Sequence, residues 1–228
     1  MGEKAVAAAK AVNYIGAGTI EFLVDKHRNY YFLEMNTRLQ VEHPITEEVV
    51  GVDLVKEQIK VADNQVLKLK QEDIKQRGHA IECRICAEDT EMNFMPSPGV
   101  IKQITEPNGI GVRIDSYVYE GYEIPIYYDP MIGKLIVWAT TREYAIERMR
   151  RVLHEYKLTG VKNNISYLRC IMDTADFVEG HYDTGFIAKN GEALQKCITH
   201  TSERSEKIAM IAAYMDYLMN LEENSGSA

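Results

Sequence analysis

Alternating and helix-periodic apolar positions divide the chain into predicted strands and helices. Two apolar runs, residues 18–24 and 30–33, flank the polar stretch 25–29, a pattern typical of a β-hairpin. Further strands are predicted at 79–86, 100–105, 111–116 and 134–139. Helices are predicted where apolar residues recur every three or four positions, at 4–14, 54–62, 141–156, 164–174 and 202–221. This mixture of helices and short strands predicts an α+β fold.

The helix predicted at 202–221 has an apolar side wider than a single stripe. Core packing is the commoner explanation of such a face, and docking of a partner is the alternative. Ser202 would begin a partial capping box, with Ser205 where Glu would be ideal. The acidic and small residues 222–228 are expected to be disordered.

A polar stretch at 63–75 indicates a link between two domains. We expect residues 1–66 to form one domain, 67–190 a second domain, and 191–228 a helical tail. The chain has 228 residues and 46% hydrophobic content, enough for one large or two small domains.

Each strand of the predicted hairpin carries one carboxylate, Glu21 in the first and Glu34 at the end of the second. If the hairpin folds about the midpoint of His27 and Arg28, these side chains face each other with Cβ atoms about 5 Å apart. Like charges at that distance are destabilising, and hard divalent cations prefer carboxylate and carbonyl oxygens. The register therefore predicts a metal site, although a hairpin with ordinary salt bridges is an open alternative.

Polar side chains continue past Glu34 with the period of a strand. Asn36, Arg38 and Gln40 would share the face of Glu34 if the extended conformation persists. Two carboxylates, an amide and a guanidinium on one surface suit a metal-bound phosphate beside a small oxyanion.

The charge of the chain narrows its possible partners. The net charge is −8 and no cluster of Lys and Arg occurs, which argues against nucleic acid and anionic membranes as general partners. No apolar run reaches the roughly 18 residues of a membrane span.

Cys83 and Cys86 have C-x-x-C spacing but lie in a predicted strand, where residues three apart point to opposite faces. Reduced cysteines in a cytoplasmic protein are therefore the simpler interpretation of all four.

The segment Glu34-Met-Asn-Thr-Arg-Leu-Gln-Val-Glu-His-Pro-Ile-Thr-Glu47 resembles the signature of biotin carboxylases, the ATP-grasp enzymes of acetyl-CoA, propionyl-CoA and pyruvate carboxylases. The resemblance continues through residues 51–56, 77–85, 87–89, 96–99 and 127–134. It implies the C-terminal half of an ATP-grasp domain, an antiparallel sheet with helices, followed by the biotin carboxylase C-terminal α+β domain. The family's first domain and glycine-rich ATP lid have no counterpart in this sequence, and Thr90 stands where the family usually has proline.

The resemblance also implies which residues meet the nucleotide. Glu21, Glu34 and Asn36 match ligands of the Mg²⁺ or Mn²⁺ ions, in two sites, that bridge the ATP phosphates. Glu21 and Glu34 thereby belong to the ATP site, and Leu23 is expected to line the nucleotide pocket.

The remaining assignments concern bicarbonate and biotin. Arg38, Gln40 and the backbone amide of Val41 match the bicarbonate site. Glu42 matches the general base that deprotonates bicarbonate, and Arg113 the arginine that stabilises the biotin enolate.

The implied reaction is ATP-dependent carboxylation of carrier-bound biotin by bicarbonate, through carboxyphosphate. The implied partners are a carboxyltransferase subunit, a biotin carboxyl carrier protein or domain, and a second copy in a homodimer. Because the ATP lid has no counterpart, the chain alone is expected not to turn over ATP. Two alternatives are a non-catalytic dimerisation or carrier-docking module and an ATP-grasp ligase of the carbamoyl-phosphate type.

Overall fold

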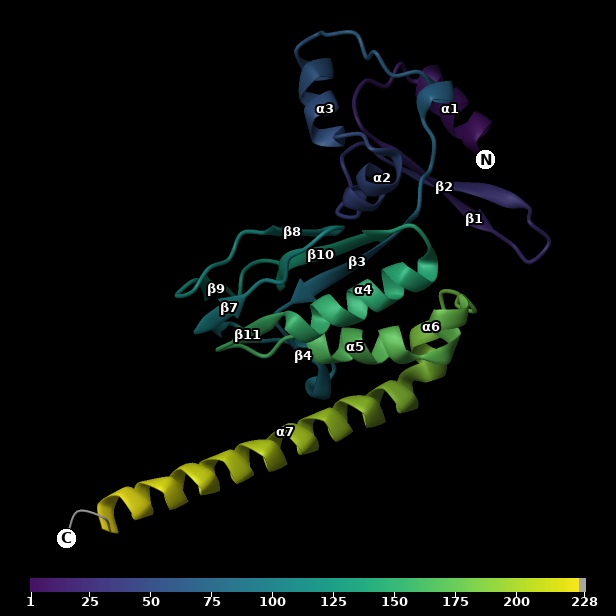
Figure 1. Cartoon of the computed structure of the whole chain (residues 1–228). Helices are drawn as coiled ribbons and strands as arrows, with labels where there is room; N and C mark the ends of the chain where they lie inside the picture. The colour runs from purple at the N-terminus through teal and green to yellow at the C-terminus, as the bar shows by residue number, and fades with distance from the viewer. Residues whose placement is uncertain (226–228) are drawn as a thin grey trace. The chain divides into compact units, whose positions relative to one another are not determined.

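The computed structural model describes the backbone of residues 1–225 and the side chains of that range apart from 200–205 and 219–225. The chain divides into two compact units, which are described separately. Unit 1 contains Met1–Glu82 and Ile136–Ala145, and unit 2 contains Cys83–Leu135 and the chain from Ile146 onward. Helices and short antiparallel strands make up both, as predicted for an α+β fold (Figure 1).

Unit 1 begins with helix α1 (Gly2–Ala11), followed by strands β1 (Thr19–Val24) and β2 (Tyr30–Asn36). Helices α2 (His43–Val50) and α3 (Leu54–Ala62) and a 3-10 turn, η1 (Gln71–Asp73), complete its first part. Asp53 caps α3, because its carboxylate accepts a hydrogen bond from the Lys56 amide at 2.8 Å.

The β1–β2 hairpin places Glu21 opposite Glu34, as the sequence predicts. Nearer the turn the predicted register is wrong, because β2 contains a bulge and Phe22 pairs with Phe32. The Asp25 carboxylate accepts hydrogen bonds from the His27 and Asn29 amides, which shapes the turn.

A three-stranded sheet has the order β3 (His79–Cys86), β10 (Met131–Ala139) and β8 (Val112–Ser116). The middle strand β10 is the most buried, as expected for a strand with neighbours on both edges. Three two-stranded sheets pair β11 (Lys157–Thr159) with β7 (Gln103–Thr105), β4 (Glu88–Asp89) with β5 (Met95–Pro96), and β6 (Gly99–Val100) with β9 (Glu123–Ile124). The 3-10 turn η2 (Thr90–Met92) follows β4.

Helices α4 (Arg142–Glu155) and α5 (Ile165–Asp173) lie side by side in Figure 1. The helix predicted at 141–156 buries one apolar stripe, formed by Ala145, Met149, Val152 and Leu153. Asn164, just before α5, is buried, and its side chain bonds the backbone of β3 twice, accepting from the Cys86 amide and donating to the Arg84 carbonyl. These two bonds fix the start of α5 against β3.

Helices α6 (Ala175–Glu179) and α7 (Phe186–Ser225) complete unit 2. The prediction that α7 starts at Ser202 is wrong, because the helix begins sixteen residues earlier and buries its first turns, including Leu194 and Ile198. The explanation of its apolar face by core packing is wrong for residues 206–218, where every side chain is exposed. Residues 222–225, expected to be disordered, are helical, and 226–228 lie outside the described residues.

The expectation of four reduced cysteines is also wrong, because Cys170 and Cys197 form a disulfide between α5 and α7. The pairing depends on two helices meeting in space, which the spacing of cysteines in the sequence does not reveal. Among the described residues, no helix has the length and apolar character to cross a membrane.

Candidate active site

One side-chain amide bridges the paired carboxylates of the hairpin, and a second amide binds one of them. The Asn36 amide donates to Glu21 Oε1 at 2.8 Å and lies 3.3 Å from Glu34 Oε1. Gln40 donates to the same Glu21 oxygen at 3.1 Å. Four polar side chains therefore converge on the end of the hairpin away from its turn.

The charge of this cluster is not balanced from within. In the part of the chain that the structure describes, neither Glu21 nor Glu34 forms an ion pair with Lys or Arg, and their partners are neutral amides. Two anions held together by neutral donors gain from a cation, because the repulsion between them is otherwise unrelieved. The cluster therefore has the electrostatics of a cation site.

The oxygen-rich donor set fits Mg²⁺ or Mn²⁺ better than Zn²⁺. Across the described residues, no group of three or more His, Cys, Asp or Glu could form a metal site of its own. Mg²⁺ is commonly held by one or two carboxylates while substrate phosphates and water fill its other positions. Rotation of the Asn36 amide would turn its oxygen toward such an ion.

The strand does not extend as far as the predicted shared face requires. β2 ends at Asn36, and residues 37–42 form an irregular turn before α2. Gln40 nevertheless reaches Glu21 from this turn. Arg38 is exposed, and its Nη1 donates to the Leu39 carbonyl at 3.1 Å.

The start of α2 fixes this turn. The Gln40 carbonyl lies 2.7 Å from His43 Nδ1 and accepts from the His43 amide at 3.3 Å. Glu42 is exposed at the helix N-cap position, and Pro44 is buried in the first helical turn. The backbone of 40–42, which includes the Val41 amide, is thus held by helix-start geometry.

Glu47 has a role that the sequence analysis did not predict. It is 8% exposed, and its Oε1 accepts a hydrogen bond from the Leu54 amide at 2.6 Å. This bond ties α2 to the start of α3. The signal in the sequence is its place in the signature segment, but the bond depends on two helices meeting, which that segment does not reveal.

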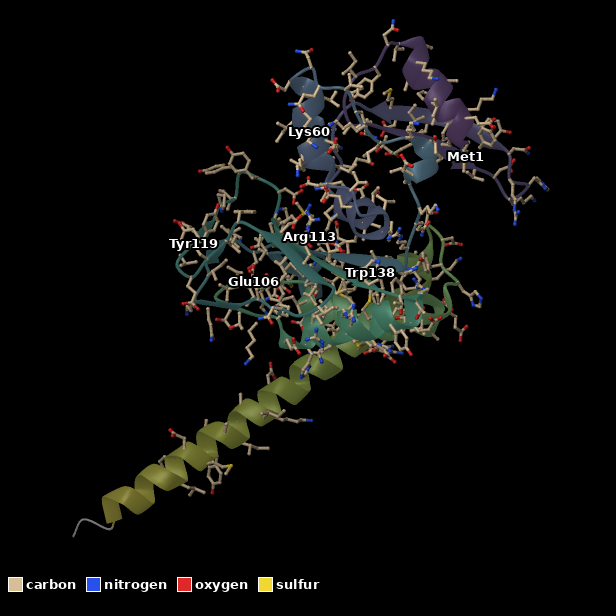
Figure 2. The ribbon with its side chains drawn as sticks, turned by 45° about the horizontal axis from the view of Figure 1, so that its top comes forward. Met1, Lys60, Glu106, Arg113, Tyr119 and Trp138 are labelled. Carbon is tan, nitrogen blue, oxygen red and sulfur yellow. A yellow bond between two sulfur atoms is a disulfide. The ribbon has the colours of Figure 1, made fainter. Side chains whose placement is uncertain are left out.

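Arg113 projects from β8 in unit 2 (Figure 2). It forms a two-pronged ion pair with Asp115, with Nε to Oδ1 at 2.7 Å and Nη2 to Oδ2 at 2.9 Å. The ammonium group of Lys134 lies 3.3 Å from Asp115 Oδ2. Burial opposes ionisation of Asp115, but the hydrogen bonds and charges of Arg113 and Lys134 outweigh it and lower the pKa of the carboxyl. One carboxylate therefore partly neutralises the arginine.

Leu23 lies on β1 and is 59% exposed, so its apolar side chain is available to a ligand surface. On the neighbouring strand, Tyr31, Phe32 and Leu33 are exposed too. The hairpin therefore combines a polar end with apolar flanks.

Known proteins share both the sequence and the fold. The family model "Biotin carboxylase C-terminal domain" matches residues 82–189, and "Carbamoyl-phosphate synthase L chain, ATP binding domain" matches residues 1–70. Biotin carboxylase of Arabidopsis thaliana chloroplasts is 54% identical over 194 residues, which is 85% of this chain. This chain belongs to the biotin carboxylase family. The match extends beyond the C-terminal domain, because 194 residues exceed the span of that model.

Further members give the same result. A pyruvate carboxylase component of Methanothermobacter thermautotrophicus is 47% identical over 96% of this chain and 48% of its own length. The biotin carboxylase domain of Hydrogenobacter thermophilus 2-oxoglutarate carboxylase superposes with a TM-score of 0.81 at 47% identity, covering 83% of this chain and 42% of that one. That crystal structure is a dimer in complex with MgADP, ADP and bicarbonate. The chain spans 36% to 42% of the length of the first curated biotin carboxylases it matches.

Proposed function

We propose that this chain supplies the metal, bicarbonate and biotin-enolate residues of an enzyme that carboxylates biotin with bicarbonate and ATP. The observation that carries the proposal is the carboxylate pair Glu21–Glu34, bridged by the Asn36 amide and lacking an ion-pair partner among the described residues. Family membership supports it, since the matched relatives are named as biotin carboxylases and as components of pyruvate carboxylase. The final acceptor of the carboxyl group is not part of the proposal.

Glu21, Glu34 and Asn36 would hold Mg²⁺ or Mn²⁺ beside the ATP phosphates. A bound divalent cation offsets negative charge on the phosphates during phosphoryl transfer. The carboxylates would hold that ion beside the triphosphate, and Leu23 would contribute apolar contact to the nucleotide. The exposure of Leu23 on the same hairpin supports this role.

Bicarbonate would bind in the turn before α2. Arg38 and Gln40 supply fixed cationic and amide donors, and the Val41 amide supplies a backbone donor. Glu42, at the N-cap of α2, accepts the bicarbonate proton as the oxyanion attacks the γ-phosphate. The resulting carboxyphosphate breaks down to CO₂ and phosphate, phosphate removes the biotin ureido proton, and the enolate captures CO₂.

Arg113 would stabilise the biotin enolate, since guanidinium keeps its charge at any working pH. Its ion pair with Asp115 reduces the positive potential it can offer, so a second arginine is worth testing beside it. Arg84 lies on β3 of the same sheet, within the family-like segment 77–85, and its side chain is exposed between buried neighbours. Arg84 is therefore the second candidate for the enolate role.

The carrier protein, the carboxyltransferase and a homodimer are proposed partners, and the cytoplasm is the proposed location. The proposed division is an ATP-grasp part over 1–66, a C-terminal domain over 67–190 and a helical tail over 191–228. Because the chain is about two fifths of the relatives' length, we expect no ATP turnover by the 228 residues alone.

The test uses the chain joined to an N-terminal half from a family member. Glu42→Gln should lower bicarbonate-dependent ATP hydrolysis by about 10²–10⁴-fold, the usual contribution of a general base. Glu72→Gln, at an exposed position of η1, is the matched control and should keep full activity. Near-normal activity of Glu42→Gln would remove Glu42 from the base role.

The same assembly separates the two arginines. The arginine that serves the enolate should, when changed to Ser, reduce biotin carboxylation far more than bicarbonate-dependent ATP cleavage. Arg113→Ser is expected to show this split and Arg84→Ser is compared with it. If only Arg84→Ser shows the split, the role passes to Arg84. Equal loss of both activities in Arg113→Ser would mark Arg113 as a structural residue.

A further inference from the structure

The first turns of α7 are anchored on α5 by a small apolar cluster. Leu194 and Ile198 are 2% and 4% exposed and pack with Cys170 of α5. Tyr167 and Ile171 border the same cluster. Beyond Ile198, the described side chains of α7 at 206–218 are all exposed. The cluster is therefore the last buried anchor of the described helix, and Figure 1 shows α7 continuing away from α5.

The disulfide closes this anchor. Cys170 and Cys197 are 27 positions apart, and their Cα atoms lie 6.1 Å apart, within the usual range for a bridge. Cys197 directly precedes Ile198, so the covalent bond lies at the last buried turn. A cross-link at that point restrains the helix at the last turn in which a described side chain is buried.

The two cysteines differ in exposure. Cys170 is 5% exposed, whereas Cys197 is only partly buried. Cys197 is therefore the expected point of attack by an external thiolate, with the Cys170 thiolate as the leaving group.

The other two cysteines are poor competitors for this exchange. Cys83 is 3% exposed within β3. Burial, followed by the nearby charges of Glu88 and Asp129, raises the pKa of Cys86 to about 12. Thiols react as thiolates, so Cys86 stays protonated and unreactive at neutral pH.

We propose that the Cys170–Cys197 pair is a redox-sensitive clamp that fixes the base of α7 to α5 and is opened by protein dithiol reductants. In the opening reaction, a reductant thiolate attacks Cys197 Sγ, forming a mixed disulfide and releasing the Cys170 thiolate, which takes up a proton. The second reductant thiol then attacks the mixed disulfide and releases Cys197. Two electrons pass to the clamp, and the reductant leaves as a disulfide; exchange with an oxidised dithiol protein reverses both steps. This proposal is independent of the carboxylation chemistry.

The first experiment counts thiols in the full chain. Protein purified without reductant should accept two alkyl groups after denaturation, on Cys83 and Cys86, and a 170–197 cross-linked peptide should be found. Native treatment with dithiothreitol should raise the count to four. A count of four before reduction, or a pair that native dithiothreitol leaves intact, would overturn the proposal.

The second experiment measures amide hydrogen exchange over 186–199. We expect exchange to accelerate at least about tenfold on reduction, while α4 is unchanged. The double variant Cys170→Ser with Cys197→Ser should exchange fast with or without reductant, and Cys86→Ser should respond like wild type. Equal exchange of oxidised and reduced protein in this segment would show that the bond does not restrain α7 and would refute the clamp.

Discussion

Two charged clusters on strands of the molecule differ in whether their negative charge is balanced by nearby cations. On the hairpin, Glu21 and Glu34 face each other, the Asn36 amide bridges them and the Gln40 amide donates to Glu21; the described residues give neither carboxylate a cationic partner. On β8, Asp115 lies between Arg113 and Lys134, and both cations are within ion-pair distance. The first cluster carries surplus negative charge, and the second contains its own counter-charges.

The difference indicates what each cluster can do. The negative charge of a carboxylate with cations on both sides is already balanced, so such a group contributes mainly to stability. Two carboxylates held together by neutral amides are electrostatically incomplete, and an added cation would lower their free energy. We therefore assign ligand binding to the hairpin cluster and a structural contribution to Asp115.

The largest expected effect is on catalysis. In the assembled enzyme, Glu34→Gln should reduce ATP cleavage by about 10²-fold or more, because the ion beside the ATP phosphates would lose an anionic ligand. The measurement is the steady-state rate at saturating ATP over a range of Mn²⁺ concentrations. A variant with wild-type rate and wild-type Mn²⁺ dependence would contradict a ligand-binding role for the hairpin cluster.

Asp115→Asn should have its effect on stability. We expect a loss of about 1–2 kcal/mol in the free energy of unfolding, because Lys134, 12% exposed, and Arg113 keep their charges but lose their shared partner. Urea denaturation of the 228-residue chain measures it, with Glu72→Gln as the control. If Asp115→Asn is as stable as the control, the β8 cluster does not contribute to stability.

The acid dependence of stability should follow from the same carboxyl. The folded state lowers the pKa of Asp115 from its ordinary value of 3.8, so its stabilisation is complete above that pH. It is lost as the pH falls below 3.8 through the lower pKa of the folded state. Wild type should therefore show a steeper fall in unfolding free energy below pH 3.8 than Asp115→Asn, and parallel curves would contradict the assignment.

The smallest effect is expected at the hairpin without metal. Glu34→Gln removes the repulsion from Glu21 and should raise stability by about 0.5 kcal/mol in the presence of a chelator. In Mn²⁺ the sign should reverse, because wild type alone gains binding energy. Destabilisation by Glu34→Gln in chelator would show that the carboxylates already stabilise one another through their amides.

The sequence predicted the part of the site that depends on local geometry. Glu21 and Glu34 are placed opposite each other by strand alternation and a short turn, and Asn36 by its position two residues further on. The bulge in β2 was not predicted because turn geometry, not alternation, sets the register there. Gln40 reaches Glu21 from an irregular turn, so the extended strand predicted to carry it there is wrong, although its side chain does lie at the carboxylate pair.

Long-range contacts were the least predictable. The bond from Glu47 to the Leu54 amide and the Cys170–Cys197 pair each require two helices to meet. The apolar side of 206–218 follows a helical period but does not reveal whether anything packs against it, and in this chain those side chains are exposed. Local periodicity predicted that helix, whereas its burial depends on tertiary structure.

The central claim is that the hairpin carboxylates form a divalent-cation site, and Mn²⁺ binding to the 228-residue chain tests it most directly. Electron paramagnetic resonance of free Mn²⁺ would follow the titration of wild type, Glu34→Gln and Asp115→Asn. We predict that wild type and Asp115→Asn bind Mn²⁺ equally and that Glu34→Gln binds at least about tenfold more weakly. Equal binding by wild type and Glu34→Gln, or no binding by wild type, would contradict the claim.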